Sequence, residues 1–267
     1  MLEFSDILIA TLIGLAAGLL GGLAGVGGSM VMIPGLALTL RDPDPGSAQH
    51  VYMGAAMMVN IIVALPAAVR HHKAGAVRFD AVRIILPVMM VTIIAGVLVS
   101  NRIHGERLRQ FLAIFIAGYS VYTILRLLRK HPEPTAAHER VTGGRLGAIG
   151  GITGLIAGLL GIGGGVLMVP MLQVFCRLPI RNAIAVSSAV MVMSAVIGAS
   201  LKVATLGPEH GRSALEAFWL AAAMAPTAFV GAWMGASLTH RLPLVAVKLA
   251  VAALLLVVAA KLAGVGG

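Results

Sequence analysis

The stretch GLLGIGGGVLMVP, residues 158–170, has five glycines among its first eight residues and lies inside a long apolar segment. Glycine costs about 0.5–1 kcal/mol relative to alanine inside a helix, so a membrane helix has reason to avoid such a run. A near copy, GGLAGVGGSMVMIP, occupies residues 21–34. Its closing proline precedes that of the first stretch by 136 residues (170 − 34), and the same spacing matches Gly27 with Gly163. Because this spacing is about half of the 267 residues, the sequence indicates two copies of one unit.

The composition is that of an integral membrane protein. Hydrophobic residues make up 59% and charged residues 11% of the chain, and the mean hydropathy is +0.98. Soluble domains carry roughly 25% charged residues. The net charge of +10 does not indicate nucleic-acid binding, because Lys and Arg gather in short loops between apolar segments, as on the cytoplasmic side of membrane proteins. We therefore predict an all-α integral membrane protein that contacts lipid and binds no nucleic acid.

Apolar segments divide evenly between the two copies. A spanning helix needs about 20 residues, and eight segments reach or approach that length. The other two, 29–40 and 165–176, cover only ~18 Å as helices, and each follows a glycine run directly. Each half is predicted to hold a helix, a glycine break, a short broken or re-entrant helix and three full spans. The segments are 5–24, 29–40, 51–69, 81–100 and 110–128, then 145–161, 165–176, 183–204, 214–239 and 243–263.

A polar stretch in the middle of the chain, residues 129–144, separates a first transmembrane repeat over 1–128 from a second over 145–267. This linker is rich in Lys and Arg, so we expect it to be cytoplasmic. The basic loop 70–78 lies two spans earlier and falls on the same side. An odd number of crossings in each half would invert the second repeat. Inverted repeats with glycine-interrupted short helices are typical of secondary transporters.

The glycines allow two interpretations. Gly14, Gly18 and Gly22 are four residues apart on one helix face, which favours close helix packing through small residues. Adjacent glycines in Gly25–Gly28 and Gly161–Gly165 do not share a face, so packing alone does not require them. Backbone that leaves the helix at mid-membrane is tolerated only in the protein interior or along a cavity. The N-terminus of the next helix then offers N–H donors and partial positive charge, which suit an anion.

The polar and acidic side chains indicate which kind of solute the protein could transport. All ten acidic residues lie outside the middles of the predicted spans, whereas a cation pathway normally contains an intramembrane carboxylate. Asn60 and four serines (Ser187, Ser188, Ser194 and Ser200) do lie within spans, and their amide and hydroxyl groups would make a neutral to positive cavity for a small oxyanion. Two alternatives stay open: the serines bond to their own helix backbone, and Lys202 extends to the membrane surface. The predicted substrate-binding residues are Gly25, Gly27, Gly28, Ser29, Asn60, Gly161, Gly163, Gly164, Gly165, Ser187, Ser188 and Lys202.

Signatures of catalysis are missing. No lysine follows a glycine, so the loop G-x-x-x-x-G-K-[ST] of ATP-hydrolysing proteins is absent. HERVT at residues 138–142 lacks the second histidine of the zinc motif H-E-x-x-H. His50, His71 and His72 are expected to be ordinary residues at loop ends, although histidine titrates near neutral pH. The sequence predicts a protein that is not an enzyme, with no cofactor and no metal.

The paired motifs GLLGGLAGVGGSMVMIP and GLIAGLLGIGGGVLMVP resemble the duplicated signature of the TauE/SafE sulfite exporter family, also called the 4-toluene sulfonate uptake permeases. AVSS at 185–188, HHKAGAVRFD at 71–80 and GASLTHRL at 235–242 are similar to the family as well. The resemblance implies a bacterial inner-membrane carrier of sulfite, sulfonates, thiosulfate or related organosulfur anions. One departure is that Gly54 and Ala55 stand where the second half has two serines.

These observations together predict a multi-pass secondary transporter that moves small sulfur-containing anions, such as sulfite or sulfoacetate, by alternating access. The alternative is an anion-selective channel in which both glycine breaks form an open filter for a small oxyanion. The expected partners are the anion and the membrane lipid, and a homodimer stays open.

Overall fold

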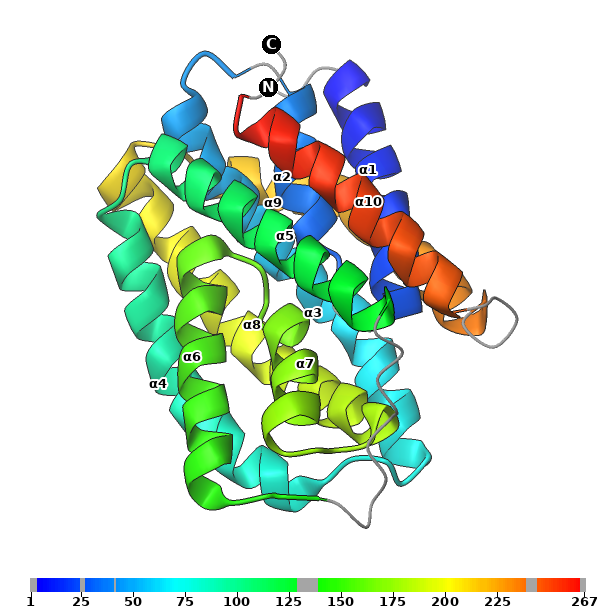
Figure 1. Cartoon of the computed structure of the whole chain (residues 1–267). Coiled ribbons are helices and arrows are strands. Elements are labelled where there is room, and N and C mark those ends of the chain that lie inside the picture. The colour runs from blue at the N-terminus through cyan, green and yellow to red at the C-terminus, as the bar shows by residue number, and fades with distance from the viewer. Residues whose placement is uncertain (1–3, 25–26, 41, 129–138, 239–243, 265–267) are drawn as a thin grey trace.

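The computed structural model describes residues 4–24, 27–40, 42–128, 139–238 and 244–264. Within these residues the chain forms ten α-helices and no strand, which confirms the all-α prediction (Figure 1). The helices are α1 Phe4–Ala24, α2 Ser29–Thr39, α3 Pro45–Lys73, α4 Phe79–Asn101, α5 Gly105–Leu128, α6 Gly143–Leu160, α7 Gly165–Phe175, α8 Ile180–His210, α9 Ala214–Leu238 and α10 Leu244–Leu262. Their order is the predicted one, with a short second helix in each half.

Seven of the described helices are long and apolar enough to cross a membrane. The sequence predicts eight. The eighth falls on α10, of which only Val251–Leu262 is described continuously with its side chains, and this stretch is shorter than a span. Helices α2 and α7 have 11 residues each, as expected for the segments that follow the glycine runs.

Two helix pairs pack through glycines. A methyl group added to Gly14 of α1 would lie 2.5 Å from the carbonyl oxygen of Met224 on α9, and Gly18 touches the backbone of Ala228 on the same helix. In the second half, Gly150 of α6 approaches the carbonyl of Ile85 on α4, with 2.8 Å to an added methyl. Only glycine lets two helix backbones come this close. The packing prediction for the four-residue glycine series is therefore confirmed.

Each of these two pairs joins a helix of one half to a helix of the other half. Helix α1 of the first half packs along α9 of the second, and α6 of the second half packs along α4 of the first. The long helices α3 and α8 also pack against each other, and each has more buried residues than any of the other described helices. In Figure 1, α2 lies in the upper part of the bundle and α7 in the lower part. Each half thus completes its packing with the other.

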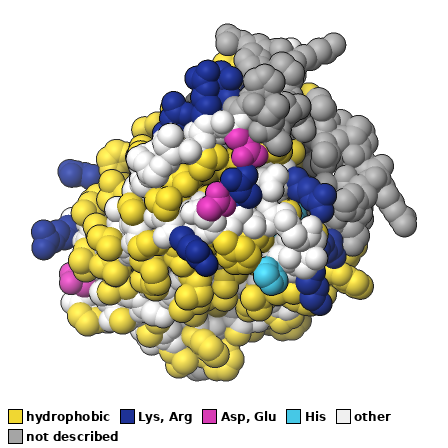
Figure 2. All heavy atoms as spheres, turned by 90° about the horizontal axis from the view of Figure 1, so that it is seen from below, with side chains coloured by type: hydrophobic (Ala, Val, Ile, Leu, Met, Phe, Trp, Pro, Cys, Tyr) yellow, Lys and Arg dark blue, Asp and Glu magenta, His cyan; other side chains and the backbone are white. Residues whose placement is uncertain are grey.

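One end of the bundle is basic. Helix α3 ends there with Arg70, His71, His72 and Lys73 in its last turn. Figure 2 shows this end, where Lys and Arg side chains stand over an otherwise apolar periphery. Arg78 bonds to Asp80 at 2.9 Å and to Glu139 at 2.7 Å, and these carboxylates raise the pKa of its guanidinium. Residues 129–138 lie outside the described chain, so the predicted cytoplasmic side stays a prediction.

Candidate functional site

Both glycine runs interrupt their helices. The backbone is non-helical at Gly27–Gly28 and at 161–164, and α2 and α7 begin at Ser29 and Gly165. Gly165, expected both as the end of the second break and as the start of the short helix 165–176, is the first residue of α7, so the helix start is confirmed and the break ends at Gly164. Gly25, another predicted site residue, lies outside the described residues.

Matched glycines at the two breaks share one unusual conformation. Gly27 has φ of +83° and Gly163 has φ of +69°, a region that residues with a Cβ rarely adopt. These are the two glycines that the 136-residue spacing aligns. Both are buried, so the two turns of backbone lie inside the protein rather than against lipid. The glycine runs therefore provide sharp turns that start the short helices.

Asn60 on α3 joins the two breaks. Its Oδ1 accepts a hydrogen bond of 3.3 Å from the backbone N–H of Gly28. A methyl group added to Gly163 would lie 2.6 Å from its Nδ2, so the amide fills the space between the two turns. Asn60 is fully buried, and its Nδ2 has no hydrogen-bond partner. A buried N–H₂ group without an acceptor is rare in proteins and marks a place where a ligand oxygen would be favourable.

Hydroxyl groups near the breaks fall into two classes. Ser187 and Ser29 are buried, and their Oγ atoms have no hydrogen-bond partner. Ser187 is one turn before Met191 on α8, and the sulfur of Met191 lies 3.4 Å from a methyl placed on Gly27, so this face of α8 is turned to the first break. Ser188 instead donates to the carbonyl of Ile184 at 2.8 Å. Ser188 thus bonds to its own helix backbone, as the open alternative had it, and the hydroxyl of Ser187 does not.

The surroundings of the breaks carry no negative charge. The buried polar residues of the described chain include no Asp or Glu. The first N–H groups of α2 and α7 add partial positive charge at the breaks. No group of three or more His, Cys, Asp or Glu side chains is placed to hold a metal within the described residues. The arrangement offers donors and dipoles, which suit an anion, and offers no ligand set for a cation.

Lys202 is not brought together with these residues. It lies four turns beyond Ser187 on α8, about 22 Å along the helix axis. Its side chain is completely buried, so the alternative that it extends to the membrane surface is wrong. Its Nζ lies 2.7 Å from His50 Nδ1. His50 is also buried rather than an ordinary loop-end residue, because α3 begins before it and its ring stacks on His210 with centroids 3.6 Å apart.

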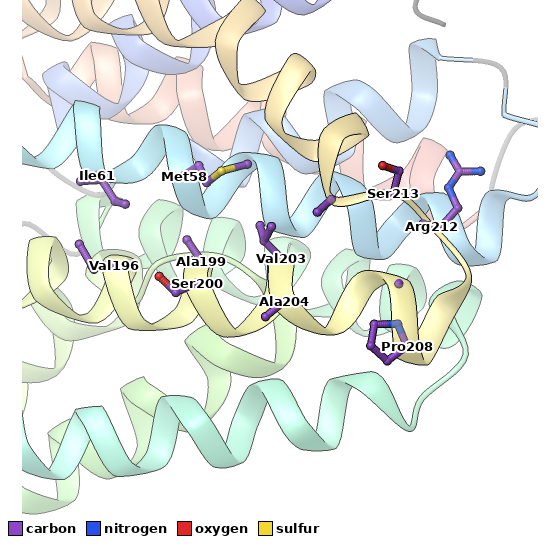
Figure 3. A pocket seen from close by; sticks show the side chains of 12 residues that line it. Met58, Ile61, Val196, Ala199, Ser200, Val203, Ala204, Pro208, Arg212 and Ser213 are labelled. Carbon is purple, nitrogen blue, oxygen red and sulfur yellow. The ribbon is translucent and has the colours of Figure 1, made fainter.

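A groove of about 610 Å³ runs along α3, α8 and the start of α9. Figure 3 shows Met58 and Ile61 at one end and Arg212 with Ser213 at the other. Its walls are mostly aliphatic, and Arg212 is already paired with Asp42 at 2.6 Å. The groove does not include the residues of the breaks. An anion would gain little from such a surface, so the candidate site is the pair of breaks around Asn60.

A known family matches nearly the whole chain. The model of the family described as Sulfite exporter TauE/SafE matches residues 10–262. The chain belongs to this family. The match includes both glycine breaks, the central linker and the described helices from Ala10 in α1 onward. The resemblance noted from the paired motifs is therefore confirmed, and the family is one of membrane transporters.

Curated relatives of the chain carry transporter names. A probable membrane transporter protein of Haemophilus influenzae is 30% identical over 46% of this chain and 48% of its own length. The probable membrane transporter proteins MamO of Magnetospirillum gryphiswaldense and Paramagnetospirillum magneticum are 27% and 28% identical over 97% of this chain. The chain spans about half the length of the curated relatives that it matches. No solved structure matches the chain.

These findings confirm a multi-pass membrane protein of a transporter family. The family and the relatives are described as transporters and not as enzymes, as the sequence predicts. Sequence reasoning missed the buried group around Lys202. Its signal was a lysine inside the apolar segment 183–204 together with a histidine near the start of the segment that it packs against.

Proposed function

We propose that this protein is a secondary transporter of small sulfur-containing anions, with its substrate site at the two glycine breaks around Asn60. The observation that carries the proposal is the buried Nδ2 of Asn60, which has no partner and lies beside Gly163 while Oδ1 holds the N–H of Gly28. One amide therefore touches both breaks. An oxyanion seated there would accept from Nδ2 and from the hydroxyl groups of Ser29 and Ser187.

The charge of the site favours an anion. Each oxyanion oxygen would meet N–H or O–H donors and the positive ends of two short helices, with no buried carboxylate in the described chain to repel it. Discontinuous helices whose N-termini point at an anionic group near mid-membrane are characteristic of transporter binding sites. Sulfite and organosulfonates are the proposed cargo because the family is described as sulfite exporters.

Alternating access is the proposed mechanism, and two features support it over an open channel. The residues at both breaks are buried, so an anion reaches them only when helices move. The exchanged packing of α1 on α9 and of α6 on α4 is what a two-fold relation between repeats would produce. With α2 and α7 in opposite parts of the bundle, that relation fits inverted repeats, one of which rocks against the other.

We propose the bacterial inner membrane as the location and the basic end of the bundle as the cytoplasmic side. The membrane potential, negative inside, then favours exit of a monoanion by about 2.3 kcal/mol per 100 mV. Export of a monoanion would need no other driving force.

Counterflow in proteoliposomes tests the proposal. Vesicles are loaded with unlabelled sulfite, sulfoacetate or thiosulfate, and labelled anion is added outside. A carrier accumulates label transiently above equilibrium, and the rate saturates with concentration. Flux that equilibrates without overshoot and rises linearly would support the channel alternative. Absence of flux with all three anions would contradict the substrate class.

A further inference from the structure

A second buried polar group lies at the opposite end of the bundle from the basic loops, where α3 begins and α4 and α8 end. Lys202 is completely buried there. Its Nζ lies 2.7 Å from His50 Nδ1 on α3, 3.0 Å from Ser100 Oγ on α4 and 2.7 Å from Asn101 Oδ1 on α4. The nitrogen of a second-half helix is thus held by three side chains of the first half.

The three neighbours match a charged ammonium group. The hydroxyl of Ser100 donates to the carbonyl of Val97 at 2.8 Å, so its oxygen is left to accept. Asn101 Oδ1 only accepts. His50 Nδ1 accepts when the proton of the neutral ring is on Nε2. Three acceptors meet three N–H bonds. A neutral amine has only two N–H bonds, so one of the three acceptors would face its lone pair.

No counter-charge touches this ammonium group in the described chain. The titratable groups around it are His50 on α3, His210 at the end of α8, His104 before α5 and the exposed Glu209. Helix α4 contributes only the neutral Ser100 and Asn101. A buried cation held by dipoles alone is expensive in a membrane protein, and such residues usually take part in ion or proton movement.

We infer that Lys202 is the binding site of a proton whose movement is coupled to anion transport. The inference rests on the proposed carrier function. Protonated Lys202 ties α8 to α3 and α4 through three hydrogen bonds and keeps this end of the repeat interface closed. Release breaks one N–H bond of the ammonium group, its electron pair stays on Nζ, and the proton passes to water that enters beside the half-buried His210. No electron is transferred. The remaining amine holds three acceptors poorly, so the helices separate.

The test is proton movement in proteoliposomes containing a pH indicator, with thiosulfate and sulfoacetate as probes. Both anions stay ionised at neutral pH, so protons that move with them are carried by the protein. In the Lys202→Met variant, exchange of labelled for unlabelled anion should remain measurable but slower, because methionine cannot form the three hydrogen bonds that close this end of the repeat interface. Proton movement that accompanies net transport should fall at least tenfold. Lys261→Met, which removes an exposed lysine on α10, is the matched control and should change neither.

Proton movement that persists in Lys202→Met would overturn the inference. If the original protein exchanges neither anion, the proposed function fails first. If Lys202→Met does not fold, Ser100→Ala replaces it, since it removes a single acceptor. The proton should then bind about tenfold more weakly, and the pH of half-maximal net transport should fall by about one unit. Ser194→Ala is its control, because that hydroxyl bonds to Met191 on its own helix. An unmoved pH profile in Ser100→Ala would refute the assignment.

Discussion

Replacing Asn60 should separate the substrate site from the fold. Asn60→Asp keeps an oxygen that accepts from the N–H of Gly28, removes the Nδ2 donor and adds a negative charge between the two breaks. A lost hydrogen bond to an anion corresponds to roughly 1.5–3 kcal/mol. Repulsion between two charges about 5 Å apart adds roughly 3 kcal/mol at an effective dielectric constant of 20. The half-saturating anion concentration should therefore rise by about a thousandfold or more.

The assay is concentration-dependent counterflow of labelled anion at neutral pH, with thermal unfolding of the purified variant to verify that it is folded. Asn60→Leu, which removes the donor without adding charge, should raise the half-saturating concentration by roughly 10- to 150-fold. Lowering the pH should partly restore Asn60→Asp, because a protonated carboxyl group again offers a donor, and should change Asn60→Leu no more than it changes the original protein. The matched control is Asn182→Asp. Asn182 lies at the start of α8, away from the breaks, and its Nδ2 donates to the carbonyl of Ala76.

A folded Asn60→Asp protein with an affinity within threefold of the original would refute this reasoning. It would mean that the amide only fills space between the breaks and that the anion binds elsewhere.

Three further predictions concern the serines, the glycine packing and the orientation. Ser187→Ala should raise the half-saturating anion concentration about fivefold, the equivalent of one hydrogen bond of ~1 kcal/mol. Ser194→Ala should leave this concentration unchanged, and equal effects of the two variants in counterflow would contradict the role assigned to Ser187. Gly154→Ala should lower the free energy of unfolding by about 1–3 kcal/mol because its methyl would lie 2.8 Å from the carbonyl of Met89. Gly147→Ala, with nothing within 4 Å, should stabilise the same helix by up to about 1 kcal/mol in thermal unfolding. A cysteine at Thr135 should resist a membrane-impermeant thiol reagent in intact cells, and labelling there would reverse the proposed orientation.

The sequence was sufficient for the number and order of helices because hydropathy and glycine runs are local signals. It underestimated the two central helices. Helix α3 has 29 residues and α8 has 31, whereas the apolar segments that predicted them cover 51–69 and 183–204. The missing turns carry polar residues such as His50 and His210, which lower the hydropathy. Their rings stack on each other, and His50 is buried, which is a contact between segments far apart in the chain that the hydropathy does not reveal.

The candidate site was likewise predicted only in part from the sequence. The 136-residue spacing predicted that Gly27 and Gly163 are equivalent, and both have positive φ. It also aligned Gly28 with Gly164, but Gly28 has φ of −91° and Gly164 has +76°. The N–H of Gly28 also bonds to Asn60, so the two breaks are not identical in structure. Neighbouring serines on one helix point about 100° apart, and only the packing decides that Ser188 turns to its own backbone while Ser187 does not.

Accessibility of a cysteine at position 187 tests the central claim most directly. Ser187→Cys is made with the one native cysteine, the buried Cys176, replaced by serine, and the protein is placed in membrane vesicles of both orientations. The proposed carrier predicts that an impermeant thiol reagent modifies the cysteine from either side, and that a transported anion such as sulfite or sulfoacetate slows the modification from both. Modification from a single side, or modification that none of the anions slows, would contradict a substrate site at the glycine breaks that opens alternately to the two sides of the membrane.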